Sequence, residues 1–382
     1  MRTSNDFPGT QTMQAPGLYI HIPFCRSKCP YCGFYSIAAT SLIPRWVEAF
    51  KKEAALYQER FPVFNSLYLG GGTPTFLEIS TLSAMVGHIF DSFDFAPDSE
   101  ITIEANPSDL TREKIEALKD LTFNRVSLGV QSFDDRILAF LGRTHKAKEA
   151  EKALNALRDC GFENIGMDLI YGFQGLSHNK WIDILKKAVT FQPEHLSCYE
   201  LTFEKRTPFQ NLKNRGEIRP LREREACAFF VETSEFLEDN GYIHYEVSNF
   251  ARDEDRYARH NSKYWNHVPY LGLGPSAHSF IGSKRWWNVR SVRQYSEALE
   301  RGQAPVLEAE DLSEDQLRIE AISLGLRCAQ GFDLKHLSDD PGLYERIAGL
   351  EDLGMLKLGK GRVIPTKRGL LASDYLALCC AD

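Results

Sequence analysis

The 382-residue sequence has no apolar run long enough to span a bilayer, so a transmembrane helix is not expected. Its first sixteen residues contain Thr, Ser, Asn and Gln but no apolar core, so they are not expected to act as a secretory signal. Positive charge is not in excess, because the formal net charge is −7, and this gives no general attraction to nucleic acid or anionic membranes. Repeats of solenoid length and low-complexity segments are also missing. The sequence therefore predicts neither membrane insertion nor nucleic-acid binding.

The overall composition is that of an ordinary globular protein, with 43% hydrophobic and 25% charged residues. The length predicts two domains, or one large domain with an appendage. Most of the nine cysteines are scattered or terminal, and we interpret them as the reduced thiols of a cytoplasmic protein. These six are Cys160, Cys198, Cys227, Cys328, Cys379 and Cys380.

The other three cysteines form a tight group, because Cys25, Cys29 and Cys32 have the spacing C-x3-C-x2-C directly after a strand-like run. An odd number of cysteines in a reducing compartment does not fit a disulfide framework. A structural zinc requires four ligands and would have to take His21 or a distant cysteine as the fourth. A 4Fe-4S cluster is the better fit, because three thiolates bind three irons and leave the fourth iron open.

The next two hundred residues alternate between strand and helix patterns, which predicts a parallel sheet covered by helices. An open doubly wound sheet and a full or partial barrel both agree with this pattern. The expected strands are 17–24, 65–69, 100–105, 125–130, 165–171 and 196–201, with an edge strand at 242–247. The expected helices are 41–60, 77–93, 112–121, 134–141, 147–160, 180–189 and 222–240.

Polar groups recur at the ends of these strands. After the cysteines come a Gly-Gly-Gly-Thr-Pro turn at 70–74, Glu104, Gln131 and Asp168. Charged or amide groups in apolar strands are costly unless they have partners, so we expect these features to share one pocket. The alternative is that each one only caps a helix or closes a turn. The glycine turn lacks the Walker lysine, but its backbone allows close approach to a ligand.

The remaining segments have different characters. Residues 1–16 form a polar leader that we expect to be disordered, and 17–250 form the strand–helix domain. Residues 251–310 are predicted to be an irregular connecting region rich in aromatics and glycine. Residues 311–382 resemble a winged-helix module, with a hairpin at 356–365. Its basic residues favour a solvated surface, and a face for nucleic acid or a partner protein is the alternative.

Several motifs agree in order and spacing with one family. YIHIPFC with the three cysteines, YLGGGTPT, EANP, SLGVQSF, GRTH, MDLIYGFQG and YEVSNF closely resemble the oxygen-independent coproporphyrinogen III oxidase-like branch of radical S-adenosylmethionine (SAM) proteins. The resemblance covers most of the chain, from Leu18 onward. It implies an α/β fold, an incomplete (β/α)6 barrel with a small C-terminal domain, and a cluster whose open iron binds SAM. The matching SAM-contacting positions are Tyr19, Gly71, Gly72, Thr73, Glu104, Gln131, Arg143 and Asp168.

The chain departs from the oxidases of this branch and is more similar to its heme chaperones. The oxidases carry a fourth cysteine where this chain has Phe34, and a longer N-terminal extension. The element H-N-x-x-Y-W at 260–265 is shared with the heme chaperones. This resemblance implies heme contact, with His260 as the candidate iron ligand and the aromatic residues against the macrocycle. His278 and His21 are weaker candidates for contact with the porphyrin or the cluster.

Together these features predict a cytoplasmic protein that binds a 4Fe-4S cluster, SAM and heme. It would receive an electron from a donor to the cluster and would transfer heme to an acceptor protein. The alternative activity is that of an oxygen-independent coproporphyrinogen III oxidase, which abstracts propionate hydrogens and then decarboxylates. A radical enzyme that modifies nucleic acid rests only on the basic C-terminal residues.

Overall fold

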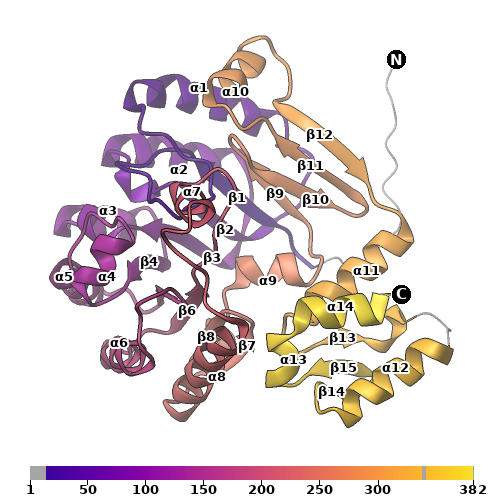
Figure 1. Cartoon of the computed structure of the whole chain (residues 1–382). Helices are drawn as coiled ribbons and strands as arrows, with labels where there is room; N and C mark the ends of the chain where they lie inside the picture. Colours follow the sequence, from indigo (N-terminus) through magenta and orange to yellow (C-terminus); the bar gives the residue numbers. More distant parts are fainter. Residues whose placement is uncertain (1–13, 338–340, 382) are drawn as a thin grey trace.

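The computed structural model describes residues 14–337 and 341–381, so residues 1–13 of the predicted leader lie outside the described part. Twelve strands form one large sheet and three form a small C-terminal sheet (Figure 1). The large sheet contains β1 (Gly17–Ile22), β2 (Phe64–Gly71), β3 (Phe95–Ala105), β4 (Arg125–Gln131), β5 (Ile165–Tyr171), β6 (His195–Glu200), β7 (Ile243–Glu246), β8 (Asn249–Ala251), β9 (Tyr270–Leu273), β10 (His278–Ile281), β11 (Lys284–Asn288) and β12 (Val306–Asp311). The small sheet contains β13 (Phe332–Asp333), β14 (Leu356–Gly359) and β15 (Arg362–Pro365).

The order of the large sheet is β12-β11-β10-β9-β1-β2-β3-β4-β5-β6-β8-β7. Strands β1 to β6 are neighbours in chain order and pair in parallel. A doubly wound sheet reverses its strand order at a switch point, whereas a barrel keeps the order of the chain. The outer neighbours of β1 and β6 are β9 and β8, so the six strands do not close on each other. The predicted incomplete (β/α)6 barrel is confirmed.

Each of the six parallel strands leads into one or two helices, as the alternating pattern predicts. The helix after β1 is amphipathic, and it buries Trp46 edge-on against Phe24 with their ring centres 5.3 Å apart. The helices of this part are α1 (Ile43–Ala55), α2 (Ile79–Ser92), α3 (Arg112–Asp120), α4 (Asp135–Phe140), α5 (Ala147–Asp159), α6 (His178–Thr190), α7 (Pro208–Asn214) and α8 (Glu223–Asp239). Short 3-10 turns lie at η1 (Thr40–Leu42), η2 (Pro74–Phe76) and η3 (Pro107–Asp109).

The prediction of an irregular region over 251–310 is wrong. This segment contains η4 (Glu254–Arg256), α9 (Arg259–Trp265), α10 (Val292–Glu300) and the strands β9 to β12, which extend the sheet beyond β1 (Figure 1). Strand β9 pairs in parallel with β1, and β10 to β12 continue as antiparallel strands. The strands are short and contain glycine where backbones approach closely. A Cβ at Gly272 would lie 2.1 Å from the His278 carbonyl oxygen.

The C-terminal part has the predicted hairpin and a core of its own. Strands β14 and β15 pair over Leu356–Pro365 and turn through Lys360 and Gly361, both with positive φ. The helical segment after the hairpin is divided at Ala372. The helices here are α11 (Glu314–Gly325), α12 (Pro341–Asp352), α13 (Lys367–Leu371) and α14 (Ser373–Ala381), with a 3-10 turn at η5 (Leu334–His336). The division of the chain into four parts remains a prediction.

The basic residues of this C-terminal part are largely committed to internal contacts. Arg362 donates hydrogen bonds to the carbonyl oxygens of Gln330 and Gly331, at 2.8 and 2.7 Å. Lys367 forms an ion pair with Glu238 of α8. These contacts favour the interpretation of the charges as structural and solvated rather than as a nucleic-acid surface. Among the described residues, none of the helices has the length and apolar character needed to cross a membrane.

Candidate cofactor site at the carboxyl ends of the strands

The loop after β1 carries the three clustered cysteines, all half-buried and free of disulfide bonds. Its two ends are held by the backbone, because the Cys25 amide donates to the Ile37 carbonyl at 3.1 Å and Cys32 donates to Cys29 at 3.1 Å. Burial raises the pKa of the Cys32 thiol, and the nearby Cys29 and Cys25 thiols also raise it. The fold therefore brings the three thiols together in one partly accessible loop.

The glycine turn after β2 is attached to this cysteine loop. The Gly72 and Thr73 amides donate to the carbonyls of Ile22 and Phe24, both at 2.8 Å, so the turn continues the pairing of β1 with β2. The Thr73 hydroxyl lies 3.4 Å from the Cys25 sulfur. A Cβ at Gly72 would lie 2.5 Å from the Phe24 carbonyl oxygen, so only glycine allows this approach.

Arg143 approaches the cysteine loop from the segment between α4 and α5. Its Nη1 donates to the Cys29 sulfur at 3.5 Å, and its Nη2 donates to the Gly129 carbonyl at 3.0 Å. Its buried Nε has no hydrogen-bond partner among the described residues. A guanidinium in this position stabilises negative charge on the thiolates and retains a donor for a ligand.

Gln131 ends β4 next to Arg143. Its backbone has a φ of +65°, which is unusual for a residue other than glycine and turns the chain sharply at the strand end. A Cβ at Gly129 would lie 2.9 Å from the Gln131 Nε2 and 3.4 Å from an Arg143 nitrogen, so both side chains cross the same glycine. Gln131 and Arg143, both predicted SAM-contacting positions, therefore lie beside each other.

Glu104 lies near the end of β3 and contacts the glycine turn. Its Oε1 accepts a hydrogen bond from the Tyr68 hydroxyl at 2.8 Å, and its Oε2 accepts one from the Gly71 amide at 3.1 Å. Burial raises the pKa of Glu104 to about 7, although the Tyr68 hydrogen bond opposes the rise, and the negative charge of Asp168 raises it further. The carboxyl is therefore held in a site that favours its proton in the absence of a cation.

Asp168 lies on β5, two strands away, and is close enough for its charge to act on Glu104. Its carboxylate oxygens accept from the Ser127 hydroxyl at 3.3 and 3.2 Å. Burial raises the pKa of Asp168 despite opposing hydrogen bonds and the charge of Arg125. Neither Asp168 nor Glu104 forms an ion pair within the described residues. Two enclosed carboxyls that form no ion pair with the described residues fit a ligand that carries positive charge.

Tyr19 and His21 line the inner face of β1 beneath the cysteine loop. The His21 Nε2 lies 2.8 Å from the Tyr35 carbonyl oxygen, which can only accept, so Nε2 carries the proton. The His21 Nδ1 therefore accepts from the Tyr19 hydroxyl, 3.0 Å away. Burial lowers the pKa of His21 to about 4, and the ring is neutral. His21 thus orients Tyr19 and has no free nitrogen for an iron.

The donor set fits the two groups that the sequence implies. A cubane cluster requires thiols that reach separate irons, and among the described residues no three His, Cys, Asp or Glu side chains converge on one single-ion position. The SAM sulfonium and ammonium complement the two unpaired carboxyls, and Arg143 offers a donor for a carboxylate. Six of the eight predicted SAM positions lie at strand ends or in loops, while Tyr19 and Asp168 lie in the middle of β1 and β5.

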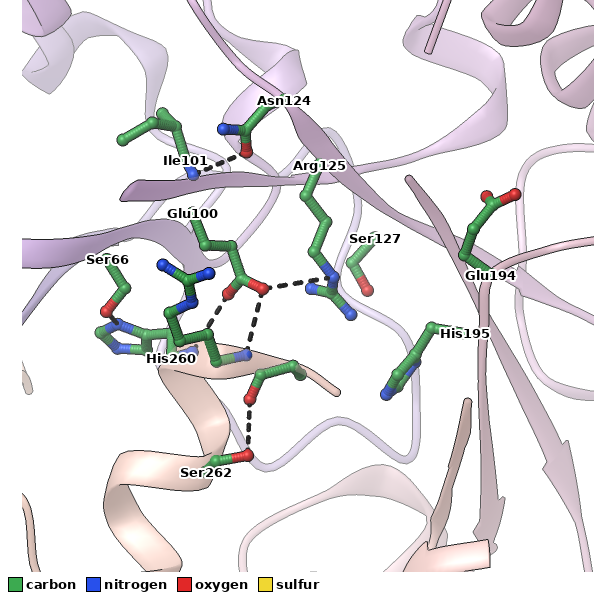
Figure 2. A network of polar contacts seen from close by, with 12 residues as sticks. Ser66, Glu100, Ile101, Asn124, Arg125, Ser127, Glu194, His195, His260 and Ser262 are labelled. Atoms are coloured by element: carbon green, nitrogen blue, oxygen red, sulfur yellow. Dashed lines mark hydrogen bonds and ion pairs between the residues drawn. The ribbon is translucent and has the colours of Figure 1, made fainter. Parts of the chain in front are cut away.

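His260 does not belong to this group. Its Nδ1 lies 3.0 Å from the Ser66 hydroxyl (Figure 2). Its Nε2 lies 2.9 Å from the Tyr264 hydroxyl, and the side chain is buried. Burial lowers its pKa to about 3. Ser66 lies near the start of β2, so His260 lies toward the amino ends of the strands, opposite the cysteine loop. With both ring nitrogens occupied, this geometry argues against the predicted role of His260 as an iron ligand.

A buried ion pair beside His260 was missed by the sequence analysis. Arg125 is the first residue of β4, and Glu100 lies on β3 beside Ser66 of β2. The Arg125 Nε and a Glu100 carboxylate oxygen are 3.9 Å apart (Figure 2). Glu100 also accepts from the backbone amides of Arg259 and His260, both at 3.0 Å. Glu100 therefore anchors the first residues of α9 to β3. The signal in the sequence was a charge at the start of each of two apolar strands.

Comparison with known proteins agrees with this site. The Radical SAM superfamily model matches residues 19–188. A protein of Mycobacterium tuberculosis named heme chaperone HemW is 33% identical, and the match covers 97% of this chain and 96% of the relative. The HemW proteins of Synechocystis and Bacillus subtilis are 35% and 32% identical, covering 82% and 93% of this chain and 78% and 96% of their own lengths. This chain belongs to the HemW family.

The fold of this HemW family member is also that of a solved structure. The coproporphyrinogen III oxidase HemN of Escherichia coli superposes with a TM-score of 0.83, covering 96% of this chain and 90% of its own. The two sequences are 24% identical, so the likeness describes the fold. It includes the extension of the sheet and the C-terminal part, because nearly the whole chain is superposed.

Proposed function

We propose that this protein is a heme chaperone that holds a 4Fe-4S cluster and SAM and transfers heme to an acceptor protein. The observation that carries the proposal is the match to proteins named heme chaperone HemW, which reaches 97% of this chain in the Mycobacterium tuberculosis relative. The site at the strand ends supports it, because its donors suit a cluster and a cationic ligand. The oxidase alternative is not favoured by these relatives.

The proposed cofactor contacts follow from the geometry. Cys25, Cys29 and Cys32 would ligate the cluster. Arg143, whose Nη1 lies 3.5 Å from the Cys29 sulfur, would balance the negative charge of the cluster. When bound, a 4Fe-4S cluster supplies an open iron for the SAM amino and carboxylate groups and an electron for its sulfonium. The glycine turn would offer backbone groups to the methionine end of SAM, while Glu104 would accept from its ammonium or ribose.

Phe34 separates this proposal from the oxidase alternative. It occupies the position two residues after Cys32, and its side chain is 69% exposed on the cysteine loop. Single exposed apolar side chains are common on protein surfaces, and this one adds an apolar ring to the loop that carries the three cysteines. This supports a site at which an apolar molecule is received and released near the cluster.

The remaining partners are also proposals. All nine cysteines are unpaired, which supports the reducing cytoplasm as the location. A cytoplasmic electron donor would reduce the cluster, and a heme-accepting protein would take the cargo when it binds heme more tightly. Transfer then follows the difference in affinity and requires no chemistry on the porphyrin.

The experiment that tests this function uses one anaerobically reconstituted preparation. Ferric heme is titrated into the protein, apomyoglobin is added as an acceptor, and coproporphyrinogen III is supplied with SAM and a reductant in a parallel sample. We expect about one heme per chain, transfer of heme to apomyoglobin and no protoporphyrinogen. Repeated turnover of coproporphyrinogen III, or no heme binding at all, would contradict the proposal.

A further inference from the structure

The extended part of the sheet places His278 on the same face as the cofactor site. Tyr19 of β1 pairs with Gly272 of β9, so the two residues lie on the same face of the sheet. Tyr270, two residues before Gly272, shares this face and pairs with Phe280 of β10. Side chains two residues apart in a strand share a face, so His278 lies on the side of the sheet that carries Tyr19 and His21. His278 is close enough to His21 to contribute to the lowering of its pKa.

The imidazole of His278 is available for a ligand. All ten histidines lie in the described part of the chain, and His278 is the only one among them that is exposed. Neither of its ring nitrogens takes part in a hydrogen bond or ion pair with the described residues, whereas both nitrogens of His21 and of His260 are occupied. Desolvation and the nearby charge of Arg285 lower the pKa of His278, which favours the neutral form of its ring. A neutral exposed imidazole is the form that ligates iron.

The surroundings of His278 have the other features that a heme requires. Trp287 stacks on the His278 ring, with centres 5.6 Å apart and planes inclined by 24°. The Arg290 guanidinium lies 5.6 Å above the Tyr35 ring and donates to the Gly33 carbonyl at 3.3 Å, which connects this surface to the cysteine loop. Next to Gly33 is the exposed Phe34. The surface combines an imidazole, aromatic planes and a cation suited to a propionate.

This surface is also held firmly in place. The buried Glu53 of α1 accepts from the Gly274 amide at 2.7 Å, from the Asn288 side chain at 2.5 Å and from the Tyr295 hydroxyl at 2.5 Å. Gly274 precedes β10 and Asn288 ends β11, so one carboxylate fixes both ends of the hairpin that carries His278 and Trp287. A preorganised surface loses less entropy when it binds a rigid planar ligand.

We propose that heme binds on the surface formed by His278, Trp287, Arg290, Tyr35 and Phe34, with a nitrogen of His278 as an axial ligand to the iron. The aromatic side chains contact the macrocycle, and Arg290 pairs with a propionate. The inference rests on the proposed heme-chaperone function and specifies its cargo site. It replaces His260, whose ring is enclosed in the barrel, with a histidine that a macrocycle can reach.

The test is a ferric heme titration of the reconstituted full-length protein, followed by its Soret absorption. Wild type is compared with His278→Ala and with the control His336→Ala, which removes the other histidine whose ring has neither a hydrogen bond nor an ion pair within the described residues. We expect His278→Ala to weaken binding at least tenfold and to shift the Soret band, and added imidazole to restore the wild-type band. His336→Ala should bind like wild type.

The outcomes separate this inference from the function on which it rests. If wild type binds heme and His278→Ala has the same affinity and spectrum, the site assignment is overturned while the chaperone function stands. If wild type binds no heme, both fall. An equal loss in His336→Ala would also overturn the assignment, because it would show a general effect of histidine removal. Because His278 is exposed, its replacement should leave the thermal unfolding temperature unchanged, and this is checked on each variant.

Discussion

The raised pKa of Glu104 gives a prediction about how SAM binding depends on pH. In the free protein the carboxyl has a pKa of about 7 instead of 4.5, mainly because of burial. At about 1.4 kcal/mol per pKa unit, ionising it at its ordinary pKa would cost about 3 kcal/mol. A cation placed beside the carboxylate recovers part of this cost, so SAM and a proton compete for Glu104. We therefore expect SAM affinity to fall as the pH is lowered through 7.

The size of this effect follows from proton linkage. If binding releases one proton from Glu104, the affinity should change by at most about tenfold per pH unit below pH 7 and level off above it. In Glu104→Gln the side chain cannot titrate, so the pH dependence that belongs to this residue should disappear. The same substitution should weaken binding at pH 8 by about ten- to a hundredfold, because a charge-assisted hydrogen bond is lost.

The assay is calorimetric titration of SAM into cluster-loaded protein between pH 6 and 8, in buffers of different ionisation enthalpy. Protonation of SAM itself contributes equally to the measurements on wild type and on Glu104→Gln. The difference between the two proteins therefore reports on Glu104. Proton release should be seen with wild type and be reduced in Glu104→Gln. Equal pH slopes for the two proteins would refute the assignment of Glu104 to the cationic part of SAM.

Two other predictions concern the cluster and the scaffold. Cys29→Ala should abolish the broad iron–sulfur absorbance after anaerobic reconstitution, whereas Cys160→Ala should retain it, and normal iron and sulfide in Cys29→Ala would disprove the ligand assignment. Glu53→Ala should lower the free energy of unfolding by about 3 kcal/mol, measured by urea denaturation, because the buried donors of Gly274 and Asn288 lose their acceptor. Burial raises the pKa of Glu53 to about 7, so the folded state holds this proton more tightly than the unfolded state does. The free energy of unfolding of wild type should therefore decrease as the pH rises from 4.5 to 7. A decrease of the same size in Glu53→Ala would contradict this origin.

The strand–helix core was predictable because its signals are local. Strand β5 was expected at Ile165–Tyr171 and lies there, since a continuous apolar run flanked by turns has few other solutions. The glycine turn and the cysteines were placed correctly at neighbouring strand ends. Parallel strands bring their carboxyl ends to one edge, so the order of the motifs along the chain already implies their proximity.

The extension of the sheet could not be obtained in this way. Strand β9 has four residues, one of them a glycine, and it becomes a strand by pairing with β1, about 250 residues earlier in the chain. Pairings over such distances leave no trace in local periodicity. The same holds for Glu53, whose acidic side chain on an amphipathic helix gives no indication of three donors from α10 and the ends of the β10–β11 hairpin.

The H-N-x-x-Y-W element shows how a motif can indicate chemistry without indicating orientation. The motif was interpreted as a heme ligand followed by two aromatics that contact the macrocycle. In the structure the Tyr264 ring lies edge-on against His260 itself, with ring centres 5.4 Å apart. Tyr68 stacks on His260 with ring centres 5.3 Å apart. However, Ser66 on β2 occupies one ring nitrogen from 194 residues away, and that contact is invisible in the sequence. The fold, rather than the motif, determines which histidine can meet a macrocycle.

This distinction leads to a prediction for His260 itself. In His260→Ala the Ser66 hydroxyl and the Tyr264 hydroxyl lose their partner inside the barrel, and the cavity beside Tyr68 is left unfilled. We expect the free energy of unfolding to fall by about 2–4 kcal/mol, measured by urea denaturation of the apoprotein. Ser66→Ala, the matched control, should cost about 1 kcal/mol. Heme bound to folded His260→Ala should keep the wild-type Soret band, because its iron ligand is elsewhere. A stable variant that has lost this band would return His260 to the role of ligand and leave its enclosed ring to be explained by an opening of α9.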